Sequence, residues 1–247
     1  MVENEEGPGD RANDPPSVRA GTEPEFTVEM RSVCRRFDTP AGSVTALDRV
    51  DIEVPSGQLT VIAGPSGSGK STLLAIAACF DRADSGQVVV DGTDVQLLGL
   101  RQRRAFRQRS VGLVLPEPAD NLLSEADATA NLRWNAHLRC GLRLDDDEVR
   151  AKLALVSLED AASKRVPQLS GGEQQRLALL CALVGNPQLI LADEPTAALD
   201  REASERVIAA MRAAITSGAT MMVATHDPHV LAAADLVIRV DHGRRVE

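Results

Sequence analysis

Two kinds of apolar pattern follow one another along the chain. Near its start, "FTVEMRSVCRRF" (26–37) and "SVTALDRVDIEVP" (43–55) alternate apolar and polar residues, which indicates antiparallel strands. Three later stretches carry continuous apolar runs instead: "GQLTVIAG" (57–64), "PQLILADEP" (187–195) and "ATMMVATHD" (219–227). Such runs are typical of strands buried on both faces of a sheet. The pattern therefore predicts an antiparallel β region and a separate buried sheet.

The segments between these strands complete the expected fold. A helix is predicted from about Lys70 to Phe80, and "SGQVVVDGTDV" (85–95) indicates a strand, a D-G turn and a second short strand. Helical segments are expected between the last two strands and after them. Strands that alternate with helices predict an α/β fold with a mainly parallel core sheet. Functional groups then lie at the carboxyl ends of those strands.

Two further segments differ from this pattern. Residues 1–24 are acidic and rich in Pro and Gly, which predicts a disordered tail. Residues 117–168 are polar and mostly helical in pattern, with helical spacing in "DDDEVRAKLALVSL". We expect a helical subdomain at about 117–168, inserted into one domain that spans 25–247.

Composition narrows the possible functions. Aromatic residues make up only 2% of the chain and the formal charge is −9, which argues against a nucleic-acid partner. The four cysteines form no CxxC pair, and scattered single thiols fit a reducing cytoplasm. We find no signal-peptide pattern at the start and no apolar run long enough to cross a bilayer. A role at a membrane would therefore require a partner.

The segment "LRQRRAFRQR" (100–109) is a strongly basic predicted helix. It could contact an acidic or membrane-adjacent surface of a partner, or it could be an ordinary solvated helix face. The sequence leaves both interpretations open.

The first chemical motif is "GPSGSGKS" (64–71), which fits the phosphate-loop pattern G-x-x-x-x-G-K-[ST] between a strand and a helix. Its glycines let backbone N–H groups face phosphate oxygens at the start of a helix. Lys70 is placed to reach the β- and γ-phosphates, and the Ser71 hydroxyl can ligate Mg²⁺. A glycine-rich turn without a ligand is the alternative. The predicted nucleotide-binding residues here are Gly64, Pro65, Ser66, Gly67, Ser68, Gly69, Lys70, Ser71 and Thr72.

A second motif ends the strand "LILAD" in two carboxylates. We predict that Asp193 holds Mg²⁺ through water and that Glu194 is the general base that polarises an attacking water. A helix cap with a solvent-facing acid is the alternative for an isolated pair of this kind.

The third motif is "LSGGEQQR" (169–176), in which Ser170 and Glu173 form a capping box. A helix should begin at Gly171, with Gly171 and Gly172 leaving its first N–H groups unshielded. Such a helix start attracts anions. A chain with a single phosphate loop does not need a second anion-binding helix start. In a head-to-tail pair of chains, however, the helix start of one chain can complete the phosphate site of the other. We therefore expect Ser170–Gly172 of each chain to face the γ-phosphate held by Lys70 of the other.

These motifs, with "LILADEPTAALD" and "THD" in this order, resemble the ATP-binding subunit of ABC transporters over roughly residues 26–246. Within that family the chain is most similar to the lipoprotein-releasing, macrolide-export and cell-division group. The resemblance implies a P-loop NTPase (RecA-like) core with an antiparallel β subdomain and an inserted α-helical subdomain. It also implies ATP and Mg²⁺ as cofactors, an ATP-dependent homodimer, and a membrane permease as partner. The chain would then lie in the cytoplasm, peripheral to the inner face of the cell membrane.

The resemblance assigns three more site residues. Asp200 matches a loop residue that links the two ATP sites across the dimer, and His226 in "THD" matches a histidine that touches the γ-phosphate. Phe37 matches an aromatic residue that stacks on adenine, a contact worth about 1–3 kcal/mol by analogy with base–aromatic stacking. His226 could instead be an ordinary strand-end residue, and Phe37 a core residue.

The chain also departs from the family pattern. Pro116 in "VGLVLPEPADNLL" stands where the family has a glutamine that contacts Mg²⁺ and water. Proline offers neither a side-chain amide nor a backbone donor. Loss of one polar contact costs about 1–3 kcal/mol, or about one to two decades in rate, so we expect slowed ATP hydrolysis. Glu117 or Asn121 could substitute. Cys181 stands where the family has an arginine, and the sequence offers no account of that change.

Two functions from different classes fit these residues, and a third is disfavoured. The chain could be an ATPase subunit that drives a permease, or a low-turnover scaffold gated by nucleotide that tethers a membrane complex. A DNA-repair or translation ATPase is disfavoured because it would normally carry two ATPase domains or long coiled-coil insertions. The cargo and the direction of transport cannot be predicted from these residues.

Overall fold

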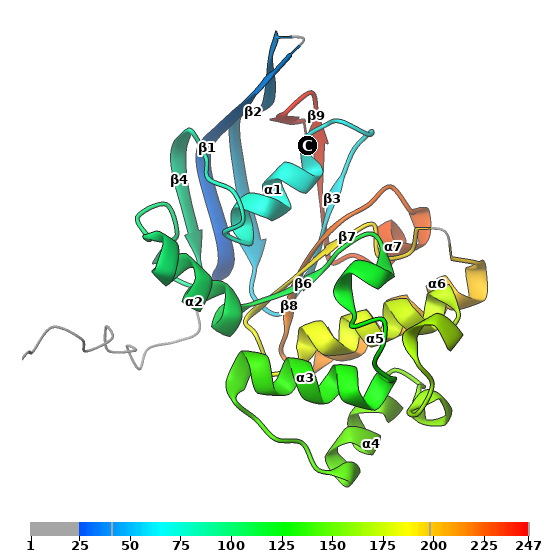
Figure 1. The fold of residues 1–247 in the computed structure, drawn as a ribbon. Helices are drawn as coiled ribbons and strands as arrows, with labels where there is room; N and C mark the ends of the chain where they lie inside the picture. The colour runs from blue at the N-terminus through cyan, green and yellow to red at the C-terminus, as the bar shows by residue number, and fades with distance from the viewer. Residues whose placement is uncertain (1–24, 41, 198, 247) are drawn as a thin grey trace, which may run out of the picture.

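The computed structural model describes residues 25–40, 42–197 and 199–246. The predicted disordered tail, 1–24, lies outside the described residues. Two sheets and two groups of helices form the fold (Figure 1).

The first sheet is antiparallel, with the strand order β2-β1-β4-β5. Its strands are β1 (Phe26–Thr39), β2 (Gly42–Pro55), β4 (Ser85–Val90) and β5 (Thr93–Asp94). The predicted D-G turn joins β4 to β5, and Asp91 and Gly92 both have positive φ, at 48° and 68°. That conformation suits a tight two-residue hairpin turn.

The second sheet has the order β10-β9-β3-β8-β7-β6, and all its neighbours are parallel except β10 and β9. Its strands are β3 (Leu59–Ala63), β6 (Val111–Val114), β7 (Leu189–Asp193), β8 (Thr220–Ala224), β9 (Leu236–Asp241) and β10 (Arg244–Arg245). The helix expected after "ATMMVATHD" is α7 (Pro228–Ala233), and it is followed by β9 and β10, two strands that the sequence pattern did not predict. In β9 the exposed Arg239 lies between the buried Ile238 and Val240, which interrupts the apolar run.

The helices cover both faces of the second sheet. α1 (Lys70–Ala77) packs against β7 and β8 on one side and against β2 and β4 on the other, so it joins the two sheets. It ends at Ala77, earlier than the predicted Phe80. The remaining long helices are α2 (Leu100–Ser110), α3 (Ala128–Cys140), α4 (Asp146–Ala154), α5 (Gly171–Leu183) and α6 (Arg201–Thr216). Three 3-10 turns, η1 (Pro118–Asn121), η2 (Glu159–Ala161) and η3 (Val166–Gln168), lie among them.

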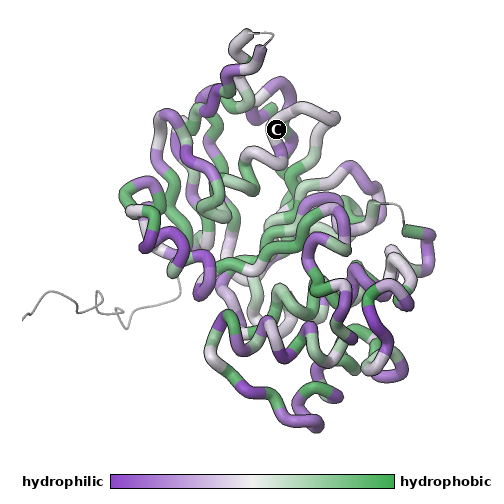
Figure 2. Tube along the Cα trace, in the orientation of Figure 1, coloured by the Kyte–Doolittle hydropathy of each residue, from purple (hydrophilic) through white to green (hydrophobic). Residues whose placement is uncertain are grey.

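The buried strands divide their side chains between two cores. In β7, Leu189 and Leu191 pack toward α1 and the antiparallel sheet, whereas Ile190 and Ala192 pack toward α3–α6. This alternation explains the continuous apolar runs, because both faces of the sheet are covered. Figure 2 shows the hydrophobic colour following these central strands. The P-loop NTPase core, the antiparallel β subdomain and the helical subdomain expected from the sequence are thus confirmed. Among the described helices, none combines the length and the apolar character needed to cross a membrane.

Candidate ATP-binding site

The phosphate loop connects β3 to α1 and touches the first sheet. Gly69, the N-cap of α1, has a φ of 103°, and a Cβ there would lie 2.5 Å from the carbonyl oxygen of Ala46 in β2. A Cβ at Gly64 would lie 2.1 Å from the carbonyl oxygen of Val240 in β9. Only glycine fits these two positions, so the loop is held tightly between both sheets.

Lys70 is almost fully buried, and its ammonium closes the loop. The Nζ atom donates hydrogen bonds to the carbonyl oxygens of Gly64 and Pro65, each at 2.9 Å. The cation therefore lies against the first two residues of the loop that the sequence predicts for phosphate.

Oxygen ligands for a divalent cation lie beside the lysine. The Ser71 hydroxyl is hydrogen bonded to the Asp193 carboxylate at the end of β7. Burial raises the pKa of Asp193 and the neighbouring Glu194 carboxylate raises it further, while Ser71 and Lys70 oppose this shift. Two adjacent carboxylates in a partly buried position favour a cation. The hydroxyl and carboxylate oxygens are also the ligands that Mg²⁺ prefers, so the residues fit the expected Mg²⁺ site, in which the ion would neutralise phosphate charge.

Glu194 is held by the end of the neighbouring strand. Its carboxylate accepts a hydrogen bond from the Thr225 hydroxyl at 2.8 Å and lies 2.9 Å from Nδ1 of His226. The residue has a positive φ of 45°, and its N–H donates to the carbonyl of Ala224 at 2.8 Å. Non-glycine residues in this strained region occur often at functional sites.

The register of the sheet brings these groups together. Asp193 is aligned with Ala224 in the parallel β7–β8 pair, so the next residues of both strands meet at the carboxyl edge. A second bond, from the Thr196 hydroxyl to Asp227 at 2.6 Å, ties the two following loops together. Sequence reasoning named Glu194 and His226 but missed Thr225, Thr196 and Asp227. Only the order of the strands in the sheet, which no local motif encodes, reveals them.

The start of α5 forms the predicted capping box. The Ser170 hydroxyl accepts from the N–H of Glu173 at 3.2 Å, and the Glu173 carboxylate accepts from the N–H of Ser170 at 2.7 Å. That backbone hydrogen bond lowers the pKa of Glu173, with Lys164 also contributing. Ser170 and Gly171 are exposed. No hydrogen bond joins 170–172 to 64–72 in the part of the chain that the structure describes.

The two glycines of this stretch have different surroundings. A Cβ at Gly171 would meet only Leu199, at 3.7 Å, whereas a Cβ at Gly172 would lie 2.8 Å from the Cβ of Ala203 in α6. Gly171 therefore leaves the helix start open to an external ligand, while Gly172 allows α5 and α6 to approach. Asp200, which caps α6 by accepting from the N–H of Ala203 at 2.7 Å, lies exposed nearby.

Phe37 lies in the β1–β2 hairpin, paired with Val44. Its side chain is partly exposed, and the Arg35 guanidinium carbon lies 4.4 Å from the ring centroid. Val44 lies two residues before Ala46, whose carbonyl oxygen faces Gly69 of the phosphate loop. Phe37 is therefore not a core residue.

The loop at Pro116 is fixed by Asn121. The Asn121 side chain accepts from the N–H of Leu115 at 2.7 Å and donates to the carbonyls of Leu115 and Glu117, each at 3.1 Å. Both ends of the amide are thus used within the loop, which argues against Asn121 as a substitute for the family glutamine. Glu117 remains, with an exposed side chain.

The basic helix α2 is partly structural. Arg103 is buried and donates to the carbonyl of Asp81, and Arg107 donates to the carbonyl of Cys79 at 2.8 Å. Arg101, Arg104 and Arg109 remain exposed. Part of this helix is thus neither a partner surface nor a solvated face, and both interpretations stay open for the exposed arginines.

Cys181 stands where the family has an arginine, and the guanidinium near it belongs to Arg139 of another helix, α3. Burial raises the pKa of the Cys181 thiol to about 12, so it is a packing residue, and the Arg139 cation of α3 is close enough to oppose that shift. Arg139 donates to the carbonyls of Val184 at 3.1 Å and Val111 at 2.8 Å. It thereby links α3 to the end of α5 and to β6.

Residues 47–197 match the ABC transporter family. The chain belongs to the ABC transporter ATP-binding proteins. This ABC cassette is 37% identical over 221 residues to the macrolide export ATP-binding/permease protein MacB 1/2 of Paracoccus denitrificans, a match that covers 89% of the chain. The chain spans only about one third (33%) of that exporter's length. It is also 36% identical over 218 residues to the lipoprotein-releasing system ATP-binding protein LolD of Porphyromonas gingivalis, covering 87% of this chain and 97% of that protein.

A solved relative supports the same assignment. A dimeric ATP-binding cassette in a post-hydrolysis state, bound to ADP and Pi, aligns with a TM-score of 0.79 and 30% identity, covering 89% of this chain and 97% of that one. The protein is thus an ATP-binding subunit of the ABC transporter family, whose cassettes dimerise and pair with permease subunits.

Proposed function

We propose that this ABC cassette hydrolyses ATP in a head-to-tail homodimer and thereby powers a separate membrane permease at the cytoplasmic face of the membrane. The observation that carries the proposal is the Glu194 carboxylate, held by Thr225 and His226 next to Lys70, Ser71 and Asp193. A carboxylate fixed at this edge can orient water and accept its proton. Lys70 and the loop N–H groups bind the phosphates, and Mg²⁺, when bound, neutralises charge that develops on them.

The dimer is part of the proposal because the site needs a second anion-binding surface. Ser170 and Gly171 present an exposed helix start whose capping box leaves further N–H groups free for an anion. The related cassette is described as dimeric with ADP and Pi. In the proposed dimer, this helix start lies on the triphosphate held by the other chain, with Asp200 and His226 at the same contact.

The test of hydrolysis compares wild type with Glu194→Gln. This variant keeps the shape and one hydrogen-bond acceptor but cannot accept a proton, so turnover should fall at least about a hundredfold. Glu205→Gln is the matched control, because Glu205 is an exposed carboxylate on α6 paired with Arg201. Equal turnover of wild type and Glu194→Gln would show that Glu194 is not the base.

Pro116 should slow this hydrolysis. Restoring an amide with Pro116→Gln is expected to raise turnover by about one to two decades, because one polar contact in a site is worth about 1–3 kcal/mol. Unchanged turnover in a folded variant would mean that the loop contributes nothing to the reaction.

Part of the surface fits the proposed permease. Several exposed apolar side chains lie on or beside α2 and α3, which are linked by a hydrogen bond from Gln108 to the carbonyl of Leu138. They include Leu97, Leu100, Trp134, Leu138 and Leu142. Exposed apolar residues together with exposed arginines on the same pair of helices favour an acidic, amphipathic segment of a partner. Trp134→Ala should weaken co-purification with the permease while the ATP turnover of the isolated chain stays unchanged.

A second candidate function rests on Pro116 and the Asn121 contacts that fix its loop. In it, ATP binding alone recruits the membrane partner and hydrolysis is slow. Partner recruitment by Glu194→Gln separates the two: full partner function without hydrolysis favours the scaffold, whereas recruitment without function favours the transport ATPase. Macrolides or lipoproteins, named for two relatives, define the export-like class of cargo proposed here.

A further inference from the structure

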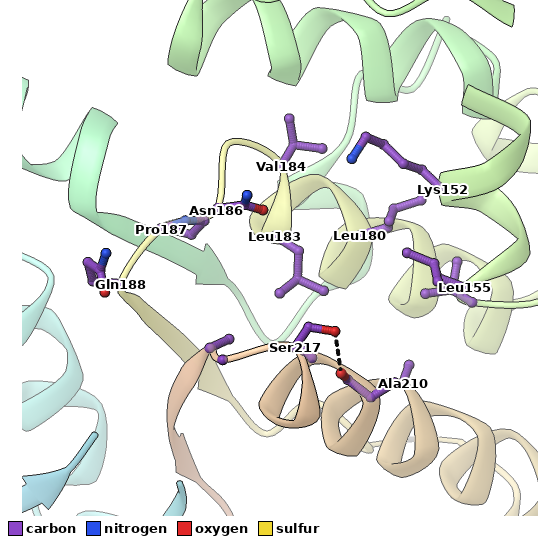
Figure 3. A pocket seen from close by; sticks show the side chains of 15 residues that line it. Lys152, Leu155, Leu180, Leu183, Val184, Asn186, Pro187, Gln188, Ala210 and Ser217 are labelled. Atoms are coloured by element: carbon purple, nitrogen blue, oxygen red, sulfur yellow. Dashed lines mark hydrogen bonds between the residues drawn. The ribbon is translucent and has the colours of Figure 1, made fainter. Parts of the chain in front are cut away.

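A cavity of about 460 Å³ lies at the opposite edge of the second sheet from the nucleotide site (Figure 3). Pro187 and Gln188, which precede β7, contribute to its wall, as do Gly218 and Ala219, which precede β8. The cavity is therefore at the amino ends of the two strands whose carboxyl ends carry Asp193 and Thr225. Nothing in the proposed ATPase cycle uses it.

Three helices supply an apolar lining. Leu180 and Leu183 come from α5, and Ala210 and Ala214 from α6. Leu155, which follows α4, is 67% exposed at this cavity. A volume of several hundred Å³ with apolar walls is typical of small-molecule sites, which bury the apolar body of a ligand.

Lys152 supplies a positive charge to the same cavity. It is half-buried, and Figure 3 shows its ammonium extending over the cavity toward Val184. No carboxylate in the described ranges lies within ion-pair distance of it. Other cations of this region do have such partners: Arg133 with Asp146 at 2.5 Å, Arg150 with Asp147 at 3.8 Å, and Lys164 with Glu173 at 3.3 Å.

We propose that this cavity binds a small amphiphilic carboxylate, with its carboxylate on Lys152 and its aliphatic body among the leucines and alanines of α5 and α6. An unpaired, half-buried ammonium favours an anion because burial makes a paired charge less costly than an isolated one. The lining residues include no Asp or Glu that would repel a carboxylate, and Leu, Val and Ala make up most of them. Asn186 and Ser217 lie at the cavity as further polar groups, although the Ser217 hydroxyl already donates to the carbonyl of Ala213 at 3.0 Å.

Two helices connect this cavity to the residues that face the proposed dimer, so a bound ligand could influence the nucleotide site. α5 begins at the signature residues and ends at the cavity, and α6 begins after Asp200 and likewise ends there. A bound carboxylate would therefore contact the far ends of the two helices that present the dimer-facing residues. Binding itself does not depend on the proposed function.

The experiment titrates the full chain with octanoate by calorimetry and compares octylammonium, which has the same tail and the opposite charge. Octanoate should bind saturably at one site and at least about tenfold more tightly than octylammonium. Lys152→Met keeps most of the aliphatic stem and should weaken octanoate about tenfold or more, while Lys152→Arg should retain binding. Arg150→Met removes a paired cation from the same helix and should change nothing.

A second variant tests the cavity rather than the charge. Ala213 is exposed on α6 at the cavity, so Ala213→Phe should fill it without disturbing the core and should abolish binding. Thermal unfolding checks that each variant is folded. Non-saturable octanoate binding, equal affinity for octylammonium, or equal affinity of wild type and Lys152→Met would overturn the proposal.

Discussion

The carboxyl edge of β7 and β8 and the start of α5 both carry groups directed at phosphate, but they differ in how far one chain completes them. At the sheet edge, Glu194 has Thr225 and His226 as partners, and Lys70 is bonded to two carbonyls. At the start of α5, Ser170 and Glu173 cap each other and Lys164 pairs with Glu173 at 3.3 Å, but Gly171 is exposed and a Cβ there would meet only Leu199. The first region is arranged by intrachain contacts, whereas the second leaves an exposed helix start that we propose a second chain completes.

The difference in internal hydrogen bonding suits the two regions to different roles, one preorganised for catalysis and one open to an incoming anion. A network that is hydrogen bonded within the chain keeps its geometry before substrate arrives, which is what a base and a phosphate cradle require. A helix start with free N–H groups gains stabilisation only when an anion meets it. The proposed head-to-tail dimer rests on this contrast, and substitutions can test the sheet edge and the helix start separately.

The largest expected effect is a gain on mixing two inactive chains. In a Glu194→Gln background, Lys70→Ala removes the phosphate cation, and Gly171→Asp places a negative charge at the helix start. Neither chain alone should dimerise with ATP. A mixture should, because one of its two sites then combines an intact Lys70 with an intact Gly171 of the other chain. Light scattering measures the mass.

Gly171→Asp suits this test because its effect on folding should be small and favourable. Position 171 has space, and an acid in the first turn of a helix stabilises it by about 0.3–1 kcal/mol. If the mixture behaves as the sum of its components, the two motifs do not meet across a dimer.

A smaller effect is expected at Gly172. Gly172→Ala would force α5 away from Ala203 of α6, where the added Cβ would lie at 2.8 Å. Overpacking of this kind costs about 1–3 kcal/mol, which exceeds the roughly 1 kcal/mol that alanine gains in helix propensity. Urea unfolding should show a net loss, and the double variant Gly172→Ala/Ala203→Gly should recover it. Gly171→Ala, the control, should not lose stability.

The smallest effect concerns Glu173. Its pKa is lowered in the folded chain, so it contributes stability above its unfolded pKa of about 4.3, and this contribution is lost as the pH falls through the folded value. Glu173→Gln should therefore be less stable than wild type by up to about 1 kcal/mol at neutral pH. The two should converge in acid. Glu125→Gln, in an exposed loop, is the control, and a pH-independent difference would show that the charge is not involved.

Elements that have a strong local sequence signal are predicted correctly. The apolar runs of β3, β7 and β8, the Asp91–Gly92 turn and the Ser170–Glu173 capping box are all confirmed. β9 was missed because its apolar run is interrupted by Arg239, which is exposed between the buried Ile238 and Val240. The end of α1 at Ala77 was also missed, since apolar residues continue to Phe80 while the helix does not.

The residues of the candidate site likewise fall into those that local motifs predict and those whose contacts only the fold reveals. Lys70, Ser71, Asp193 and Glu194 belong to local motifs, so their types and spacing identify them. The support that Thr225 and Asp227 provide depends on the alignment of β7 with β8, and the Asn121 contacts depend on the turn after Pro116. Such contacts join residues through the fold, and no spacing along the chain encodes them.

Sedimentation of the Glu194→Gln protein with ATP and Mg²⁺ tests the head-to-tail dimer most directly, because this variant should bind ATP without consuming it. We predict a two-chain species in ATP that returns to single chains when ADP replaces ATP. A species that stays a single chain in ATP, with the permease present or absent, would contradict the head-to-tail dimer.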